Sequence, residues 1–410
     1  MARFDTPDEA AAFAASFELH SPPGDFVDDP YPYYRALREH APVRTLAGGS
    51  LFLTAYEDVA SLYRSSAASS DKKREFMPKF GRSPLYEHHT TSLVFNDPPL
   101  HTRVRRLITG ALTQRAVARM EAGVVALVDR LLDSIEQRGR FDLIEDFAAA
   151  IPVEVIGNLL AVPRSERGPL RGWSLAILGA LEPVPTPTML EAGNAAVREF
   201  SNWLDELIAE RRSHPLDPDE DVLTRLIRGE GGGERLAQAE LVHNCIFLLN
   251  AGHETTSNLI GNGMDALLRH PDQLRRLQRE PGLINTAVEE MLRFESPLQF
   301  NNRCLTADTP IGKQVAPAGT LVTMCIGAAN RDPAQFADPD SFDIGRKPNR
   351  HLAFGHGDHA CVGMSVARME GRIAIGRLVA RFPGLRRDGE PERDRRLRFR
   401  GFRRLPACIG

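Results

Sequence analysis

One short segment of this 410-residue chain has the composition of a metal-binding loop. Residues 354–363 read FGHGDHACVG, with three glycines and Cys361 just ahead of a predicted helix, Gly363–Phe382. Glycine lets a backbone bend sharply or approach a flat ligand closely. A cysteine before a helix N-terminus gains from the helix dipole and the free N–H groups, which favour its thiolate form. The sequence therefore predicts that the sulfur of Cys361 binds a metal.

The ordinary alternative for any cysteine is a buried side chain that only serves packing. Five cysteines without a Cys-x-x-Cys pair do not form a disulfide framework and indicate a reducing compartment. Four of them keep the packing interpretation: Cys245, Cys304, Cys325 and Cys408.

The surroundings of Cys361 favour the metal site over packing. They resemble the haem-thiolate loop of the cytochrome P450 superfamily at Phe354, Gly355, Gly357, His359, Cys361 and Gly363. The resemblance implies that Cys361 is the axial ligand of haem b and that Phe354, His359 and Gly363 help to bind this cofactor. A thiolate ligand pushes electron density onto the iron and favours O–O cleavage.

A second motif, Ala251–Thr256 (AGHETT), falls in the middle of the predicted helix Leu236–Arg269. A threonine hydroxyl can bond the carbonyl of residue 251 and loosen the helix locally. A core helix with a glycine defect is the alternative, but it does not explain Glu254 beside two threonines. The motif resembles the oxygen-binding helix of the same family. The resemblance implies that Ala251 and Gly252 leave room beside the haem and that Glu254 and Thr255 deliver protons to oxygen.

Glu290 and Arg293 are three residues apart and can pair on one helix face. Most such pairs are exposed and contribute only ~0–1 kcal/mol. Followed by Pro297 and the cysteine loop, this one resembles the buried structural ion pair of the family. A basic residue commonly joins that pair, but the alignment places Ser341 there, so the third partner is open.

The segment Asp97–Leu107 predicts a helix whose faces differ in chemistry, because apolar, histidine–arginine and arginine–arginine pairs each fall together. By resemblance, four side chains contact the haem propionates: His101, Arg105, Arg303 and His359. A solvated basic helix is the alternative interpretation of this segment.

The elements that must position these residues are mostly helices. Besides the two helices above, long helical patterns cover Arg115–Gln137, Glu191–Arg212 and Pro271–Phe294, and strand patterns cluster at Pro42–Tyr56, Asn302–Cys325 and Leu397–Ile409. The sequence predicts a mainly α chain with small β-sheets (α+β), and the resemblance implies a triangular-prism fold that encloses one haem.

Length alone suggests two or three domains. The two candidate linkers, Glu182–Thr188 and Gly231–Gly233, are short enough to be loops. We therefore expect one domain over residues 1–410, with residues 1–28 as an N-terminal extension. No flavin or nicotinamide module is visible, so a reductase must be a separate protein.

The charge and the apolar runs exclude several classes. A net charge of −3 argues against a nucleic-acid binder. No signal peptide and no stretch of ~20 apolar residues is present, so we expect a cytoplasmic protein without membrane contact, and a monomer. The arginines of the C-terminal segment are expected to form a solvated surface: Arg393, Arg395, Arg396, Arg398, Arg400, Arg403 and Arg404.

The resemblance implies a monooxygenase that inserts one atom of O2 into a small organic substrate. Electrons are expected from a ferredoxin with an NAD(P)H-dependent reductase, docked on a basic face of Arg103, Arg106, Arg346, Lys347 and Arg350. Two alternatives are a peroxide-driven oxygenase, disfavoured by Glu254 and Thr255, and a non-catalytic haem-thiolate protein that binds a ligand or recruits a partner.

Family position also predicts the substrate pocket. It draws on Arg82–Val94, Trp173–Met189 and three further stretches, and its candidate residues are Val94, Phe247, Asn250, Gln299, Asn301 and Phe402. Polar groups among apolar ones are typical of small-molecule sites. We expect a medium-sized organic substrate with an oxygen function.

Overall fold

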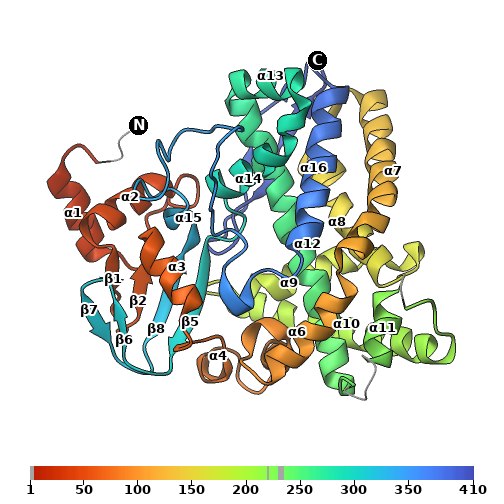
Figure 1. Cartoon of the computed structure of the whole chain (residues 1–410), viewed down its shortest axis with the longest axis horizontal. Helices are drawn as coiled ribbons and strands as arrows, with labels where there is room; N and C mark the ends of the chain where they lie inside the picture. The colour runs from red at the N-terminus through yellow and green to blue at the C-terminus, as the bar shows by residue number, and fades with distance from the viewer. Residues whose placement is uncertain (1–3, 219–220, 230–234) are drawn as a thin grey trace. The chain divides into compact units, whose positions relative to one another are not determined.

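The computed structural model describes residues 4–218, 221–229 and 235–410 (Figure 1). The predicted loop Gly231–Gly233 lies outside the described residues. The chain forms two compact units, and each combines segments that are far apart in the sequence. Unit 1 comprises residues 1–70, 258–361 and 382–410, and unit 2 comprises residues 71–257 and 362–381. A single domain over the whole chain stays a prediction.

Unit 1 contains the main β-sheet, and four of its five strands come from two of the predicted strand clusters, whereas β3 lies outside them. The strand order is β1 (Val43–Thr45), β2 (Leu51–Leu53), β8 (Leu321–Cys325), β5 (Phe300–Leu305) and β3 (Ala68–Ser69). Strands β2 and β8 are parallel, and the other pairs are antiparallel. The hairpin predicted within Pro42–Tyr56 is confirmed, with Gly49 at φ +77° in its turn. A separate hairpin joins β6 (Thr309–Ile311) to β7 (Gln314–Ala316).

The C-terminal part of unit 1 differs from the prediction. Strand β9 (Arg386–Arg387) pairs with β12 (Pro406–Cys408), and β10 (Glu392–Arg393) pairs with β11 (Phe402–Arg404). The expected strand at Leu397 and Phe399 is wrong, because this stretch is irregular and makes only an isolated bridge from Phe399 to Leu298. Buried contacts of its side chains, described below, replace the regular ladder.

The helices of unit 1 pack around aromatic side chains. They are α1 (Pro7–Ser16), α2 (Tyr31–His40), α3 (Tyr56–Arg64), α13 (Pro271–Arg279), α14 (Ile284–Phe294) and α15 (Ile326–Ala329). The single helix predicted over Pro271–Phe294 is two helices, separated by a 3₁₀ turn that begins at Pro281. The described part of residues 1–28 packs against the rest of unit 1, because Phe17 and Phe26 are buried in one aromatic cluster with Phe52.

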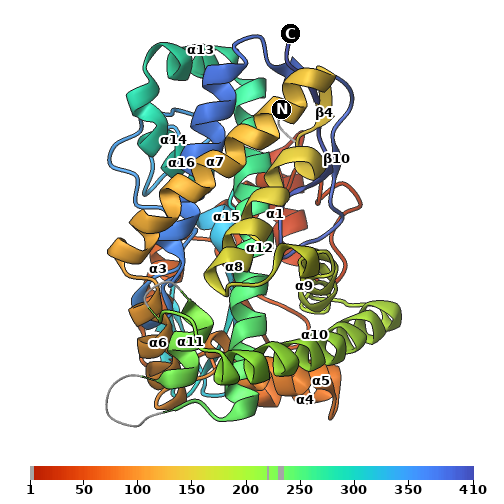
Figure 2. The same ribbon diagram turned by 90° about the vertical axis from the view of Figure 1, so that its right-hand side faces the viewer.

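Unit 2 is almost entirely helical (Figure 2). It contains α4 (Lys73–Phe80), α5 (Pro84–Thr91), α6 (Leu100–Ala111), α7 (Gln114–Arg138), α8 (Ala150–Leu159), α9 (Leu170–Gly179), α10 (Pro187–Ser213), α11 (Val222–Arg228) and α16 (Met364–Arg381). Helix α10 packs against α9 and α5, and α16 packs along α7, where Arg377 pairs with Asp129. Over the described residues, no helix is long and apolar enough to cross a membrane.

The predicted helix Leu236–Arg269 is α12 (Gln238–Arg269), and the boundary between the units falls inside it, after Ser257. The candidate linker Glu182–Thr188 is a short loop, as predicted. It ends where the Thr186 side chain accepts a hydrogen bond from the backbone N–H of Met189 and caps α10.

Candidate active site

The cysteine loop of unit 1 is a tight backbone arrangement. A 3₁₀ turn, Gly357–His359, leads to Cys361, whose N–H donates to the carbonyl of Phe354 at 2.8 Å. Gly355 and Gly357 have φ values of +65° and +70°. A Cβ at position 357 would lie 2.6 Å from the backbone oxygen of Tyr63. The loop therefore requires glycine there, and this confirms the sharp bends predicted from the sequence.

In unit 2, α12 carries the predicted acid and alcohol. The Thr255 hydroxyl donates to the carbonyl of Ala251 at 2.7 Å, the hydrogen bond expected from the sequence. Glu254 is only 3% exposed. Gly252 also lies close to α8, because a Cβ on it would lie 2.2 Å from Cδ1 of Ile156, and its predicted place beside the haem stays a prediction. Its lack of a side chain thus serves the packing of two helices.

A buried acid that the sequence analysis missed lies next to this motif. Glu370 of α16 is 1% exposed, and Thr256 makes a hydrogen bond with it. Burial raises the pKa of Glu370 to about 8, and the bond to Thr256 opposes this only partly. Its carboxyl group is therefore mostly protonated at neutral pH.

The predicted propionate contacts come from both units. His101 lies buried in α6 of unit 2, and Arg105 on the same helix is partly exposed. Arg303 lies buried in β5 of unit 1, where its guanidinium carbon is 5.6 Å from the ring centre of Tyr63. His359 ends the 3₁₀ turn of the cysteine loop. Their contacts with haem stay predictions.

The predicted ion pair is buried and doubly bonded. Glu290 and Arg293 are both 0% exposed, and Nε and Nη2 of Arg293 each donate to a carboxylate oxygen at 2.8 Å. The open third partner is Arg346, whose Nε donates to both Glu290 oxygens at 3.2 Å. Ser341 contributes only its backbone carbonyl to Arg293. Arg346 is 12% exposed, so its assignment to a surface for electron transfer is wrong.

Three of the predicted pocket residues have other partners. Gln299 makes two internal hydrogen bonds, since its oxygen accepts from the Tyr34 hydroxyl at 3.0 Å and its nitrogen donates to the carbonyl of Ser296 at 2.7 Å. Phe402 lies under the guanidinium of Arg393, 3.8 Å from its ring centre. Asn301 accepts from its neighbour Asn302 at 2.8 Å. The first two assignments are therefore wrong, because these side chains complete internal contacts of unit 1.

The other pocket residues lie in unit 2. Val94 and Phe247 are partly exposed apolar side chains. Asn250 is 2% exposed, and neither its amide nitrogen nor its amide oxygen has a partner among the described residues. Buried polar atoms in proteins usually have a hydrogen-bond partner. Asn250 therefore has hydrogen-bonding capacity that the described protein does not use.

Three further polar side chains of unit 2 share this property, and the sequence analysis did not single them out. The atoms are Nδ1 of His88 in α5, Oγ of Ser174 in α9 and Nδ1 of His243 in α12, all without a partner in the described part of the chain. The rings of His88 and His243 are 5.6 Å apart. Burial lowers the pKa of His243 to about 4 and that of His88 well below its ordinary value. Both imidazoles are neutral at physiological pH.

Comparison with known proteins agrees with this architecture. The sequence model of the cytochrome P450 family matches residues 175–399. The chain is 38% identical to cytochrome P450 107B1 of Saccharopolyspora erythraea, over 94% of this chain and 96% of that protein. It is also 38% identical to the vitamin D(3) 25-hydroxylase of Pseudonocardia autotrophica, over 94% and 95% of the two chains.

The fold is also found among solved structures. P450BioI, crystallised with an acyl carrier protein that carries hexadec-9Z-enoic acid, matches with a TM-score of 0.89 and 34% identity, over 94% of this chain and all of that one. Fold and sequence together define a haem-thiolate oxygenase. The chain belongs to the cytochrome P450 family, and it is a monooxygenase whose cofactor is haem b.

Proposed function

We propose that this cytochrome P450 oxidises a medium-sized organic substrate that carries several hydrogen-bonding oxygen groups. The observation that carries the proposal is the buried Asn250 amide, whose donor and acceptor atoms both lack a partner in the described chain. Leaving such a group unsatisfied costs about 1–3 kcal/mol. A substrate oxygen that meets Asn250 would recover that energy.

Other unpartnered polar atoms of unit 2 extend this argument. A neutral imidazole offers one donor and one acceptor, and a serine hydroxyl can do both. His88, Ser174 and His243 lie on α5, α9 and α12, within or next to the segments that family position assigns to the pocket. Unused polar atoms on three elements favour a substrate with more than one oxygen function over an unsubstituted hydrocarbon chain.

We assign the roles of the chain's residues as follows. Haem bound through the Cys361 sulfur supplies the oxygen-activating chemistry. The glycine loop fixes the backbone that presents this sulfur. Because the Thr255 proton points to the carbonyl of Ala251, the lone pairs of its oxygen stay available to accept a hydrogen bond. Glu254, a buried acid on the same helix, is the group that supplies protons for the reaction.

The axial ligand is tested by the spectrum of the reduced, carbon monoxide-bound protein. The thiolate-type red-shifted Soret band is expected, and Cys361→Ser should abolish it. If the variant keeps the band, Cys361 is not the ligand. His101→Ala and Arg105→Ala should lower haem retention without removing the band, since their proposed contacts are with propionates.

The substrate proposal predicts a selective effect of Asn250→Leu, which conserves volume but removes both polar atoms. Oxygenated compounds that produce a spin-state shift in the wild type should bind about tenfold more weakly to the variant, the loss expected for one or two hydrogen bonds. Binding of a fatty acid without further oxygen groups should change little. Equal losses for both compound classes would contradict the proposal.

For the electron source, we propose a ferredoxin-type donor with an NAD(P)H-dependent reductase, and a monomeric oxygenase. Exposed basic side chains at Arg106, Lys347 and Arg350 support an acidic partner. NAD(P)H-coupled substrate oxidation with a surrogate ferredoxin supports this source. Turnover with hydrogen peroxide but not with reduced ferredoxin would favour the peroxide-driven alternative.

A further inference from the structure

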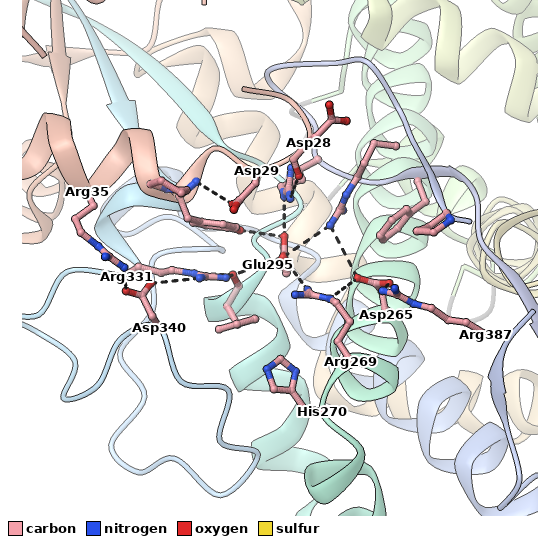
Figure 3. A pocket seen from close by; sticks show the side chains of 17 residues that line it. Asp28, Asp29, Arg35, Asp265, Arg269, His270, Glu295, Arg331, Asp340 and Arg387 are labelled. Carbon is pink, nitrogen blue, oxygen red and sulfur yellow. Dashed lines mark hydrogen bonds and ion pairs between the residues drawn. The ribbon is translucent and has the colours of Figure 1, made fainter. Parts of the chain in front are cut away.

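A cavity of about 580 Å³ in unit 1 is lined by charged side chains that the oxygenase chemistry does not use (Figure 3). Its walls come from Asp28–Arg35, the C-terminal end of α12, and the segment between Arg387 and Phe402, with Glu295 at its centre. The C-terminal arginines were expected to form a solvated surface. This is wrong for Arg393, Arg396 and Arg400, whose side chains are 13%, 11% and 6% exposed.

Glu295 is a buried carboxylate surrounded by arginines. It accepts hydrogen bonds from Nε of Arg400 at 2.7 Å, from the Tyr31 hydroxyl at 3.0 Å and from Nη2 of Arg269 at 3.1 Å. Two more guanidiniums lie within 4.0 Å, those of Arg393 and Arg331. Burial alone would raise the pKa of Glu295, but the four arginines hold it well below its ordinary value.

Asp265 is the second buried carboxylate of the cavity. It accepts from Nε of Arg269 at 2.9 Å and pairs with Arg387. Two buried carboxylates therefore face five guanidiniums: Arg269, Arg331, Arg387, Arg393 and Arg400. The remaining acids, Asp28, Asp29 and Asp340, are at the exposed rim, where Asp340 pairs with Arg35 as well as Arg331. Asp340 therefore offsets part of the charge of Arg331, and over the whole lining six arginines face five carboxylates, a surplus of one positive charge.

Two features show that this surplus is not compensated inside the protein. Burial and the neighbouring Arg400 lower the pKa of Arg393 to about 10. Nε of Arg387 is buried and has no acceptor within the part of the chain that the structure describes. At least one donor is rigidly held, because Arg331 stacks 3.4 Å from the ring centre of Tyr31 and 3.7 Å from that of Phe294.

We propose that this cavity binds a phosphate group. Guanidinium forks match the oxygen geometry of phosphate, and a phosphate carries close to two negative charges at neutral pH. Such a ligand would offset the surplus positive charge of the cavity and offer an acceptor to Nε of Arg387. The volume falls in the range of small-molecule sites, so a phosphate ester fits as well as free phosphate.

The test is calorimetric titration of the holoprotein with sodium phosphate at about pH 7.5, where phosphate is mostly dianionic. Sodium chloride of equal ionic strength is the blank. Arg387→Gln should bind phosphate at least about tenfold more weakly, because a charge-assisted hydrogen bond is lost. Arg403→Gln is the matched control. It removes the same charge from an exposed pair with Glu392 outside the cavity and should bind as the wild type does.

Glycerol 3-phosphate distinguishes a phosphate ester from free phosphate, and citrate tests whether the cavity accepts any polyanion. Tighter binding of glycerol 3-phosphate than of phosphate supports an ester as the ligand, and equal binding supports the free ion. The proposal is overturned if phosphate gives no more heat than sodium chloride, if Arg387→Gln binds as tightly as the wild type, or if only citrate binds. Should Arg387→Gln not fold, Arg393→Lys keeps the charge but loses the guanidinium fork, and unchanged phosphate affinity in it would equally overturn the proposal.

Discussion

Glu370 shows how burial changes a single residue in a way that solution experiments can detect. Its pKa of about 8 lies above the ordinary 4.5, so between these values the folded state binds more protons than the unfolded state. The free energy of unfolding therefore falls as the pH rises from about 5 to 8. Both states are protonated at lower pH, and the contribution of Glu370 is fully present there.

Glu370→Gln should remove this dependence. We expect the variant to gain stability over the wild type on the order of a few kcal/mol at about pH 8, and little at about pH 5. Urea unfolding at both pH values measures the difference. A gain that is the same at both would mean that Glu370 does not titrate in this range.

Gly355 and Gly357 of the cysteine loop permit a matched comparison. Both have positive φ, but a Cβ at Gly355 would be 3.6 Å from the Tyr63 ring, an ordinary contact, whereas a Cβ at Gly357 would collide with backbone. Gly355→Ala should cost about 1 kcal/mol of stability. Gly357→Ala should also displace the loop and reduce haem content, measured as Soret absorbance per protein. Equal haem content in the two variants would contradict the steric argument.

At the level of single residues, the sequence was sufficient to identify those whose neighbours in the chain form a motif. Cys361, Thr255 and the Glu290–Arg293 pair were found because local spacing determines their geometry. His88, Ser174 and Glu370 were missed because their importance comes from burial by other segments. Gln299 was misassigned for the same reason, since Tyr34, which fixes its amide, is 265 residues away.

At the level of elements, the buried Glu290–Arg293 pair of α14 fixes the segment that follows this helix. Arg346 and Asn349 both donate to Glu290, so the chain leading to the cysteine loop is tied to α14. Removing one partner of a buried charge cluster typically costs 3–5 kcal/mol, about the size of a small domain's stability margin.

Arg346→Gln should therefore be strongly destabilising, by roughly 2–4 kcal/mol, somewhat less than the loss of a sole partner because Arg293 remains. Lys347→Gln, the exposed neighbour, is the control and should stay within about 0.5 kcal/mol of the wild type. Chemical denaturation measures both. Similar stability of the two variants would show that Arg346 is not part of the buried cluster.

Element types were predictable where periodicity extends over many residues, as in α7, α10 and α12. The prediction of element type failed where a helix-breaking proline or a contact with a distant residue determined the local structure. Pro281 divides the predicted helix Pro271–Phe294, and the stretch around Leu397 and Phe399 loses its strand because Arg398 and Arg400 bind Asn302 and Glu295 in other segments.

For the molecule as a whole, the electron donor is the main prediction. Lys347→Glu combined with Arg350→Glu should lower ferredoxin-supported turnover about tenfold at low salt, because electrostatic steering of association is lost. The difference should shrink as ionic strength rises. Turnover with hydrogen peroxide is the control and should not change. A loss that persists at high salt would indicate damage to the fold instead of the docking surface.

The fold class and the family were accessible from the sequence because four motifs occur in one order along the chain. The ion network around Glu295 was not, since its members come from residues near 30, 270, 330 and 400 and form no local pattern. Arginines dispersed in a polar segment are predicted to be solvated, because the sequence does not show that the fold places a buried carboxylate beside them.

The contacts of the Arg400 side chain should determine how proteases degrade the protein. Its guanidinium donates to the carbonyls of Val27 at 2.7 Å and Asp28 at 3.0 Å, more than 370 positions away. A cut that released the first thirty residues would strip two acceptors from this cation and remove Phe17 and Phe26 from the aromatic cluster, which would expose Phe52. We therefore expect degradation to proceed all or none, without a stable trimmed fragment, because both ends of the chain are fastened to the same buried charge.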